Sequence, residues 1–327
     1  MNCIRLKNLR KEFSVKKKDE GLKASFKALF QRNYTTIEAV KDISFDIKQG
    51  ELVGFIGPNG AGKTTTLKML SGILYPTSGE ISVLGFNPAK RKEEFLKQIT
   101  LVMGQKEQLW SDLPAIDTFK LNKEIYDVSD KMYKEVLDSL IEIFELKEVV
   151  NQQVRKLSLG QRMKCEIAAS LIHTPKVVFL DEPTIGLDVV MQRKLREFIR
   201  KYNKEYKATV ILTSHYMDDI VEVCKRVILI NKGEVVFDND IDNLIKRYGK
   251  KKQLVVYSKK ADDEVFEKNI RRYGELIEVD HSKYTIQVER ENATKIAADI
   301  FNRLEVNDVD IKDPDLEDII VKIYEEN

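Results

Sequence analysis

Short apolar runs followed by helical spacing dominate the first part of the chain. Residues 39–47 alternate apolar and polar side chains, as in a half-buried strand, and residues 51–57 include a short apolar run typical of a buried strand. A glycine-rich loop then leads into residues 63–74, where apolar side chains recur at the i, i+3, i+4 spacing of a helix. The pattern predicts a strand, a loop and a helix in succession.

Helical periodicity continues from about residue 112 to 150 before strand patterns return. Residues 177–180 are all apolar and residues 209–214 contain the apolar run 210–212, as expected of parallel strands buried on both faces, and residues 189–206 between them have helical spacing. Residues 226–240 predict a hairpin. We therefore expect an α/β core that is interrupted by a helical insert.

The last part of the chain follows another order. From about residue 251 the patterns predict strand, helix, strand, strand, helix and strand, and then a final helix over residues 316–326. This βαββαβ order is typical of the split-βαβ, ferredoxin-like fold. A length of 327 residues also favours two domains. We place them at residues 1–248 and at residues 249–327, the second a small α+β accessory domain without a phosphate loop.

A basic segment, residues 14–33, separates two early strands. Within it Leu22, Phe26 and Phe30 share one face of a predicted helix. Two interpretations are open. We favour a solvated surface helix whose apolar stripe covers its own domain over a helix that docks on anionic lipid or a membrane partner.

Composition narrows the class of protein. The 55 Lys and Arg residues nearly balance the 53 Asp and Glu residues, for a net charge of +2, so charge gives no reason to expect a nucleic-acid partner. The three cysteines lie far apart in the sequence, which argues against a disulfide framework or a zinc ribbon. No run is apolar enough to span a membrane, and the first residues lack the apolar core of a signal peptide. We expect a globular protein that would serve a membrane only through a partner.

The glycine-rich loop matches the phosphate-binding pattern G-x-x-x-x-G-K-[ST] in its required place between a buried strand and a helix. Glycines let backbone N–H groups face the phosphates, the lysine neutralises the β- and γ-phosphates, and the final hydroxyl can bind Mg²⁺. The loop and the residue after it are Gly57, Pro58, Asn59, Gly60, Ala61, Gly62, Lys63, Thr64 and Thr65.

Two acidic residues follow the apolar run 177–180. A carboxylate at the end of a buried strand, here Asp181, is costly unless it serves a cation, and Mg²⁺ bound through water is the obvious one. Glu182 beside it would face the end of the nucleotide and hold the attacking water. The pair indicates hydrolysis rather than binding alone.

With these motifs the chain resembles the nucleotide-binding subunits of ATP-binding cassette (ABC) transporters, in the exporter branch of sodium- and drug-extruding systems. The resemblance implies a P-loop cassette, with a RecA-like α/β core, an antiparallel β subdomain and a helical subdomain at about residues 108–175. Further motifs occur in family order. They are Tyr34 as the aromatic that stacks on adenine, Gln105 in the Q-loop, the signature stretch 157–161, Asp188 in the D-loop and His215 as the switch histidine.

The resemblance implies a site shared by two chains. ABC cassettes pack head to tail, so Ser158, Gly160 and Gln161 would contact the γ-phosphate of an ATP that Lys63 holds in a second copy or a homologous cassette, with Asp188 nearby. The family usually has glycine where this chain has Leu159. A side chain there would crowd the phosphate or change the backbone, because leucine does not readily adopt φ > 0.

The implied chemistry is Mg²⁺-dependent ATP hydrolysis. Thr64, Gln105 and, through water, Asp181 would hold the metal, Glu182 would align the water, and His215 would contact the γ-phosphate. This ATPase would dimerise around two ATP molecules and power a separate membrane permease from the cytoplasmic face of the membrane, with no nucleic acid involved. The alternative is a soluble ABC ATPase that acts on nucleic acid or the ribosome. A single phosphate loop, without long heptads or zinc spacing, disfavours that alternative.

Three other residues carry weaker patterns. His173 and His281 lack a carboxylate or thiolate at ligand spacing, so we expect packing or surface histidines. For Trp110, the only tryptophan, two interpretations are equally open. It packs inside the helical insert, or it lines a groove that receives the permease.

Overall fold

The computed structural model describes residues 2–16, 34–104, 107–249, 251–259 and 264–326. The chain divides into two compact units, Met1–Asp238 and Asn239–Asn327. Most of the basic segment 14–33, with its expected helix, and Gln105 lie outside the described residues. The domain boundary expected after residue 248 stays a prediction.

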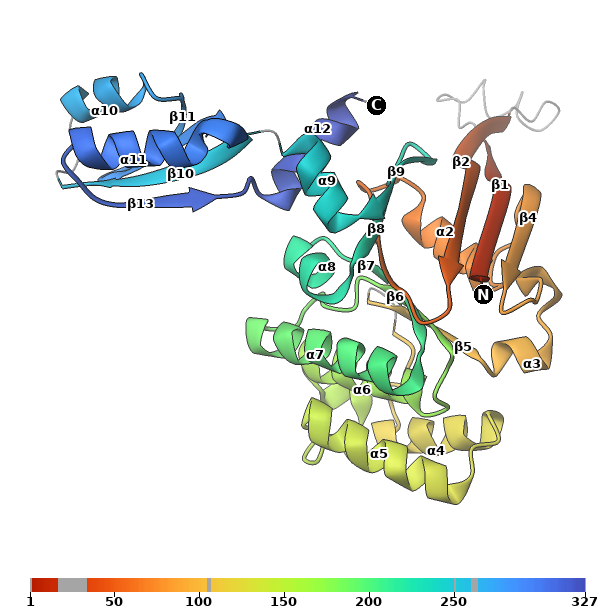
Figure 1. Cartoon of the computed structure of the whole chain (residues 1–327). Coiled ribbons are helices and arrows are strands. Elements are labelled where there is room, and N and C mark those ends of the chain that lie inside the picture. Colours follow the sequence, from red (N-terminus) through yellow and green to blue (C-terminus); the bar gives the residue numbers. More distant parts are fainter. Residues whose placement is uncertain (1, 17–33, 105–106, 250, 260–263, 327) are drawn as a thin grey trace, which may run out of the picture. The chain divides into compact units, whose positions relative to one another are not determined.

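A six-stranded sheet forms the centre of the first unit (Figure 1), in the order β5-β6-β7-β3-β8-β9. Its strands from β5 to β8 pair in parallel. All residues of β6 and β7 are buried, as their apolar central residues predict. The bounds are β3 Leu52–Ile56, β5 Ile99–Met103, β6 Val177–Asp181, β7 Thr209–Thr213, β8 Arg226–Asn231 and β9 Glu234–Asp240.

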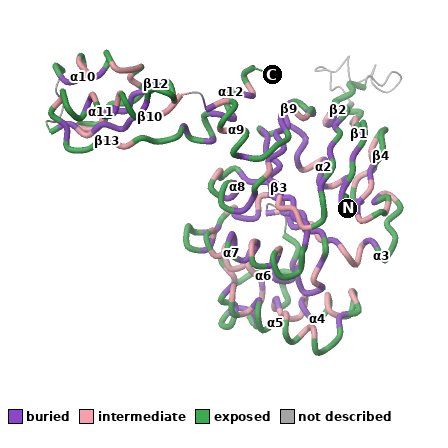
Figure 2. Tube along the Cα trace, in the orientation of Figure 1, coloured by how far each residue is buried: buried purple, intermediate pink, exposed green. Residues whose placement is uncertain are grey.

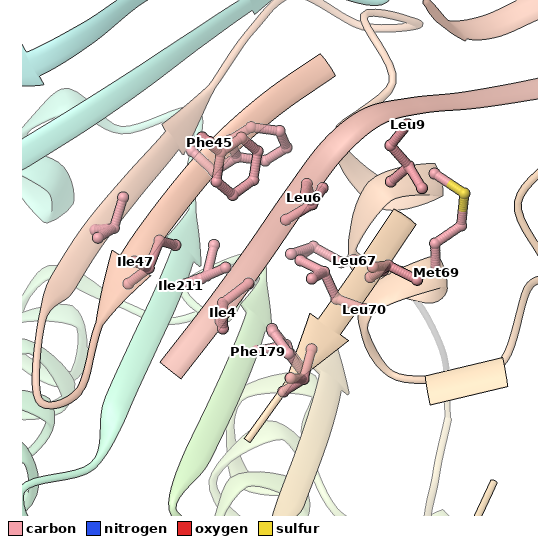
Figure 3. Close-up of a cluster of buried hydrophobic side chains, with 14 of the residues drawn as sticks. Ile4, Leu6, Leu9, Phe45, Ile47, Leu67, Met69, Leu70, Phe179 and Ile211 are labelled. Atoms are coloured by element: carbon pink, nitrogen blue, oxygen red, sulfur yellow. The ribbon is translucent and has the colours of Figure 1, made fainter. Parts of the chain in front are cut away.

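A second, antiparallel sheet has the order β2-β1-β4. Its strands are β1 Asn2–Lys16, β2 Tyr34–Lys48 and β4 Ser78–Val83. Helix α2 (Lys63–Leu70) packs against β2, β4 and β6, and so lies between the two sheets. Figure 3 shows the core that they share, with side chains from both sheets and from α2. Those labelled are Ile4, Leu6, Leu9, Phe45, Ile47, Leu67, Met69, Leu70, Phe179 and Ile211.

The expected helical insert is present. Helices α4 (Ala115–Ile125) and α5 (Asp130–Phe144) both pack on α6 (Leu159–Leu171). Ser129 caps α5 by accepting a hydrogen bond from the amide N–H of Met132. Figure 2 shows that the outward-facing side of α5 is exposed, while the central strands are buried.

The first unit contains further helices in the segments that connect its strands. Helix α7 (Val189–Tyr206) has the predicted bounds, and it packs on α8 (Met217–Val223). The short elements are η1 Pro88–Lys90, α3 Glu93–Leu96 and η2 Val154–Lys156.

The second unit contains a four-stranded antiparallel sheet in the order β11-β12-β10-β13. With α10 and α11 this is the predicted βαββαβ order of a ferredoxin-like domain. Its core includes Leu254, Tyr284 and Ile300. The bounds are α9 Ile241–Tyr248, β10 Lys251–Ser258, α10 Glu264–Ile270, β11 Glu275–Asp280, β12 Lys283–Glu289, η3 Arg290–Asn292, α11 Ala293–Arg303, β13 Val306–Lys312 and α12 Leu316–Glu326.

Two expectations from composition concern the whole described chain. None of its described helices is both long and apolar enough to cross a bilayer. Cys3, Cys165 and Cys224 are buried free thiols, in agreement with the wide spacing of these residues.

Candidate functional site

The phosphate-binding loop joins β3 to α2. Gly62 immediately precedes α2 with a φ of 108°, and a Cβ there would lie 2.5 Å from the carbonyl oxygen of Ala39. A residue with a side chain would therefore meet both backbone strain and a clash. The turn leaves the first N–H groups of α2 facing the loop, an arrangement that suits an anion.

The Lys63 ammonium folds back over this loop. It is buried and donates hydrogen bonds to the carbonyl oxygens of Gly57 (2.5 Å) and Pro58 (3.2 Å). Burial lowers the pKa of Lys63, while the negative charges of Glu182 and Asp181 partly oppose this effect. A buried cation beside two carboxylates is well placed to balance the charge of a bound phosphate.

Asp181 connects the loop to the ends of two strands. One carboxylate oxygen accepts a hydrogen bond from the Thr64 hydroxyl (2.7 Å), and the other accepts one from the Thr213 hydroxyl (2.8 Å). Thr64 and Asp181, both predicted as metal ligands, thus meet although 117 positions separate them. A hydroxyl and a carboxylate are the hard oxygen donors that Mg²⁺ prefers, so these residues fit that ion.

Glu182 and His215 form a pair at the same edge of the sheet. The Nε2 of His215 lies 2.9 Å from Oε1 of Glu182. The Glu182 amide N–H points to the carbonyl and hydroxyl oxygens of Thr213, both at 3.1 Å. The fold therefore brings these two predicted catalytic residues into direct contact.

The backbone around Glu182 is unusual. Its φ is 57°, a left-handed conformation that costs energy for a residue with a side chain. Gly104 packs against it so closely that a Cβ at position 104 would lie 2.1 Å from the Glu182 carbonyl oxygen. The sequence reasoning did not select Gly104 or Thr213, because neither belongs to a local pattern.

The signature stretch begins α6. The Ser158 hydroxyl accepts a hydrogen bond from the Gln161 N–H (3.2 Å), and the Gln161 side-chain oxygen accepts one from the Ser158 N–H (2.9 Å). This reciprocal capping box is confined to the first turn. Gly160 belongs to that turn, where Ser158 is exposed and Gly160 is half-buried.

Leu159 starts α6, and its φ does not lie in the left-handed region. Whether its side chain would crowd a phosphate stays a prediction, and within this chain it contacts another loop. A Cβ added to Gly186 would lie 2.4 Å from Cδ2 of Leu159, so Leu159 packs over Gly186. Asp188, two residues later, caps α7 by accepting a hydrogen bond from the Met191 N–H (3.0 Å). The signature and D-loop stretches are therefore neighbours within one chain.

Tyr34, the predicted adenine platform, is exposed at the start of β2 and pairs with Lys16. Phe13, which sequence reasoning did not select, pairs with Ile37. Ile37 is only two residues from Ala39, the strand residue that touches the loop at Gly62. At about 3.3 Å per strand residue, Phe13 is about 7 Å from that contact along the strand, and Tyr34 about 17 Å.

The remaining candidates among the described residues are His173, His281 and Trp110. His173 is buried and stacks on Tyr126 at 3.8 Å between ring centroids, and His281 is exposed beside Asp280, as a packing and a surface histidine should be. Trp110 is 60% exposed, which removes the interpretation that it packs inside the helical insert. Gln105 lies outside the described residues, so its role as a metal ligand stays a prediction.

Comparisons with known proteins match both units. A family model described as ABC transporter matches residues 40–185, and one described as EvrA-like ABC transporter, C-terminal domain, matches residues 255–312. ABC transporter ATP-binding protein NatA of Bacillus subtilis (strain 168) is 35% identical over 215 residues, which cover 66% of this chain and 87% of NatA. Bacitracin transport ATP-binding protein BcrA of Bacillus licheniformis is 34% identical over 65% of this chain and 69% of its own.

Solved structures share the fold. One described as an ATP-binding subunit of an ABC transporter has a TM-score of 0.64 and 24% identity, and covers 76% of this chain and 93% of its own. A dimeric ATP-binding cassette in a post-hydrolysis state, bound to ADP and Pi, has a TM-score of 0.61 and 25% identity, and covers 73% of this chain and 98% of its own.

Proposed function

This chain belongs to the ABC transporter ATP-binding proteins and is the ATP-hydrolysing subunit of a transporter, and from this premise we propose that hydrolysis takes place between two copies. The observation that carries the proposal is the separation of two anion-binding features. The Lys63 loop lies beside Glu182 and its partner His215, whereas Ser158, exposed at the start of α6, exchanges hydrogen bonds with Gln161 of its own first turn. The second feature would complete the γ-phosphate site of a partner copy.

We propose the following division of roles in one site. The loop from Gly57 to Thr64 binds the phosphates through its N–H groups, and Lys63 offsets their charge. Glu182 orients the attacking water and accepts its proton while the bond between the γ-phosphorus and the ADP oxygen breaks. His215 holds the Glu182 carboxylate and contacts the γ-phosphate. ADP and inorganic phosphate are the products.

The proposed metal is Mg²⁺, held by Thr64 and, through water, by Asp181, with Gln105 as a third ligand. When bound, the ion neutralises phosphate charge and fixes the orientation of the β- and γ-phosphates. The support from this chain is the hydroxyl–carboxylate pair, in which Thr64 and Asp181 already lie 2.7 Å apart.

Opposed donors from two chains would raise the rate because they act where charge develops. A helix N-terminus alone stabilises an anion by about 0.3–2 kcal/mol, whereas oriented donors in a water-excluded site are worth about 10²- to 10³-fold in rate. An isolated copy should therefore bind ATP and hydrolyse it slowly. The second copy would be this chain or a homologous cassette, with Asp188 of each chain near the shared face.

The transport partner that we propose is a separate membrane permease, which would hold this chain at the cytoplasmic face of the membrane. The relatives are named as transport ATP-binding proteins, one of them for bacitracin and another as a probable multidrug transporter. These names favour export, and they favour a transporter over an ATPase that acts on nucleic acid or the ribosome. No nucleic acid is expected as a partner.

Reconstitution of the full chain with its permease tests this function. The full chain is co-expressed with the polytopic membrane protein encoded next to it, and the solubilised complex is assayed for phosphate release. We expect co-purification and an ATPase rate above that of the chain alone, which Lys63→Ala abolishes. A chain that never associates with that membrane protein, or a rate that Lys63→Ala leaves unchanged, would contradict the proposal.

A further inference from the structure

A buried carboxylate, Asp219 in the first turn of α8, joins three segments of the first unit. It is fully buried. One of its oxygens accepts hydrogen bonds from the hydroxyls of Thr184 (2.7 Å) and Ser214 (2.6 Å). The other accepts one from the Arg196 guanidinium of α7 at 2.8 Å, and Arg196 is itself buried. The charge is therefore paired and both oxygens are bonded, as a buried carboxylate requires.

The two hydroxyls belong to the segments that carry the catalytic pair. Thr184 lies two residues after Glu182, and Ser214 lies immediately before His215. Ser214 is fixed a second time, because its hydroxyl oxygen also accepts a hydrogen bond from the Tyr216 N–H (3.0 Å). Asp219 thus binds both segments that carry the pair, in which Glu182 and His215 lie 2.9 Å apart.

We propose that Asp219 is a positioning residue for ATP hydrolysis, which sets the distance between Glu182 and His215 through Thr184 and Ser214. The proposal rests on the function assigned to that pair above. Asp219 itself touches neither member of the pair through the hydrogen bonds described, so its effect passes through its neighbours. Placement errors of about 1 Å cost about 10²-fold in rate, which makes such an anchor important for the chemical step.

The chemistry of the anchor calls for a carboxylate. Donors approach both of its oxygens, two hydroxyls on one and a guanidinium on the other. An amide at this position would turn an N–H group toward one set of donors, and it would leave Glu222, whose Oε2 lies 3.2 Å from the Arg196 Nε, as the remaining counter-charge of the buried Arg196. Asp219→Asn would therefore lower folding stability as well as activity, and milder variants are needed to separate the two effects.

Thr184→Val and Ser214→Ala remove one donor each while Arg196 keeps its partner. We expect kcat to fall about tenfold or more, the cost of one hydrogen bond to a charged group, with KM for ATP within about twofold. Thr184→Ser keeps the hydroxyl and loses a methyl group, so it should restore kcat although it packs less well. The matched control is Thr118→Val, which deletes a buried hydroxyl in α4 that has no hydrogen-bond partner among the described residues, and its kcat should equal that of the parent.

A readout that does not depend on turnover is the imidazole proton signal of His215 in NMR spectra. The chain has three histidines, so the signal is assigned from its loss in His215→Ala. We expect it to shift in Ser214→Ala and Thr184→Val and to stay in place in Thr118→Val. If the His215 signal is unshifted in both Ser214→Ala and Thr184→Val, the positioning role of Asp219 is wrong.

Glu182→Gln in the same assay separates the two levels of the proposal. If Glu182→Gln hydrolyses ATP at the parent rate, the catalytic assignment fails and the positioning role with it. If Glu182→Gln is inactive while Thr184→Val and Ser214→Ala both keep the parent kcat, the positioning role alone is wrong. If Thr118→Val loses as much kcat as Thr184→Val and Ser214→Ala, the positioning role is also wrong, because the loss of any buried hydroxyl would then have the same effect.

Discussion

His215 and Glu182 lie just beyond the ends of the neighbouring parallel strands β7 and β6, and the imidazole Nε2 of the histidine lies 2.9 Å from a carboxylate oxygen of the glutamate. The side chain of Glu182 is largely shielded, whereas that of His215 is about half exposed. The contact orients a carboxylate at the edge of the sheet where Lys63 and Asp181 also lie. The contact with His215 thus fixes the orientation of Glu182, the proposed general base, although the two residues are far apart in sequence.

Glu182→Gln should keep ATP binding and lose hydrolysis. The amide cannot accept the proton of the attacking water, and general-base catalysis contributes about 10²- to 10⁴-fold. Because ATP then persists between the two copies, the variant should form a stable dimer in size-exclusion chromatography with ATP. Glu197→Gln, an exposed change on α7, is the control that should behave like the parent. Hydrolysis by Glu182→Gln at the parent rate would show that this role is misassigned.

Mixed dimers should reveal that the site is shared. Ser158→Trp and Lys63→Ala should each abolish hydrolysis when purified alone, since each damages both sites of a homodimer. After mixing, one site of the heterodimer combines an intact Lys63 with an intact Ser158, so part of the activity should return. The measurement is phosphate release together with a pull-down that proves association. Associated chains that show no recovery would count against completion by a second copy.

Alanine replacements should identify the aromatic that stacks on adenine. Stacking of an aromatic side chain on a base is worth about 1–3 kcal/mol, so its loss should weaken ATP binding about 5- to 150-fold. The short distance along the ribbon favours Phe13, whereas the family resemblance pointed to Tyr34. A fluorescent ATP analogue titrated against Phe13→Ala and Tyr34→Ala decides between them. If neither change weakens binding, both assignments are wrong.

His173 should make folding stability fall with acidity. Burial lowers its pKa from 6.5 to about 4, partly opposed by a hydrogen bond to the Ile99 carbonyl. The unfolded chain therefore takes up this proton below about pH 6.5, and the folded chain only near pH 4. The stability is complete above pH 6.5 and is lost as the pH falls, by about 2 kcal/mol between pH 7 and pH 5.

Urea unfolding of the parent and of His173→Phe at the two pH values measures this contribution. The phenylalanine keeps an aromatic ring against Tyr126 but has no proton to bind. Its stability should change less with pH than that of the parent, by about the same 2 kcal/mol. Equal changes in both proteins would mean that His173 does not titrate as described.

Local patterns predicted much of the fold. Helix α7 has the bounds that its apolar spacing indicated, and the buried strands β6 and β7 form around short apolar runs. The order of the second unit was also predicted, since alternation and helical spacing reflect which side of each element is buried. By contrast α8 is only seven residues long, too short for periodicity to identify it.

The candidate site was predicted in its parts. The phosphate loop, Asp181 and Glu182 have local signatures because a strand, a turn and a helix must follow one another to expose them. His215 and Ser158 could be selected only from the family resemblance, and the roles of Tyr34, Gln105 and the signature residues stay predictions. No pattern pointed to Thr213 or Asp219, because each acts on residues that are distant in sequence.

The sequence by itself determined which segments become strands and helices and which loop can hold phosphate, because periodicity, glycine and charge act within a few residues. Only the tertiary structure decided that Thr64 meets Asp181, that His215 meets Glu182 and that Asp219 anchors both neighbouring segments. The physical reason is the pairing of parallel strands. It brings the ends of β6 and β7 together at one edge, and the distances there follow from the register of the sheet and not from separation along the chain.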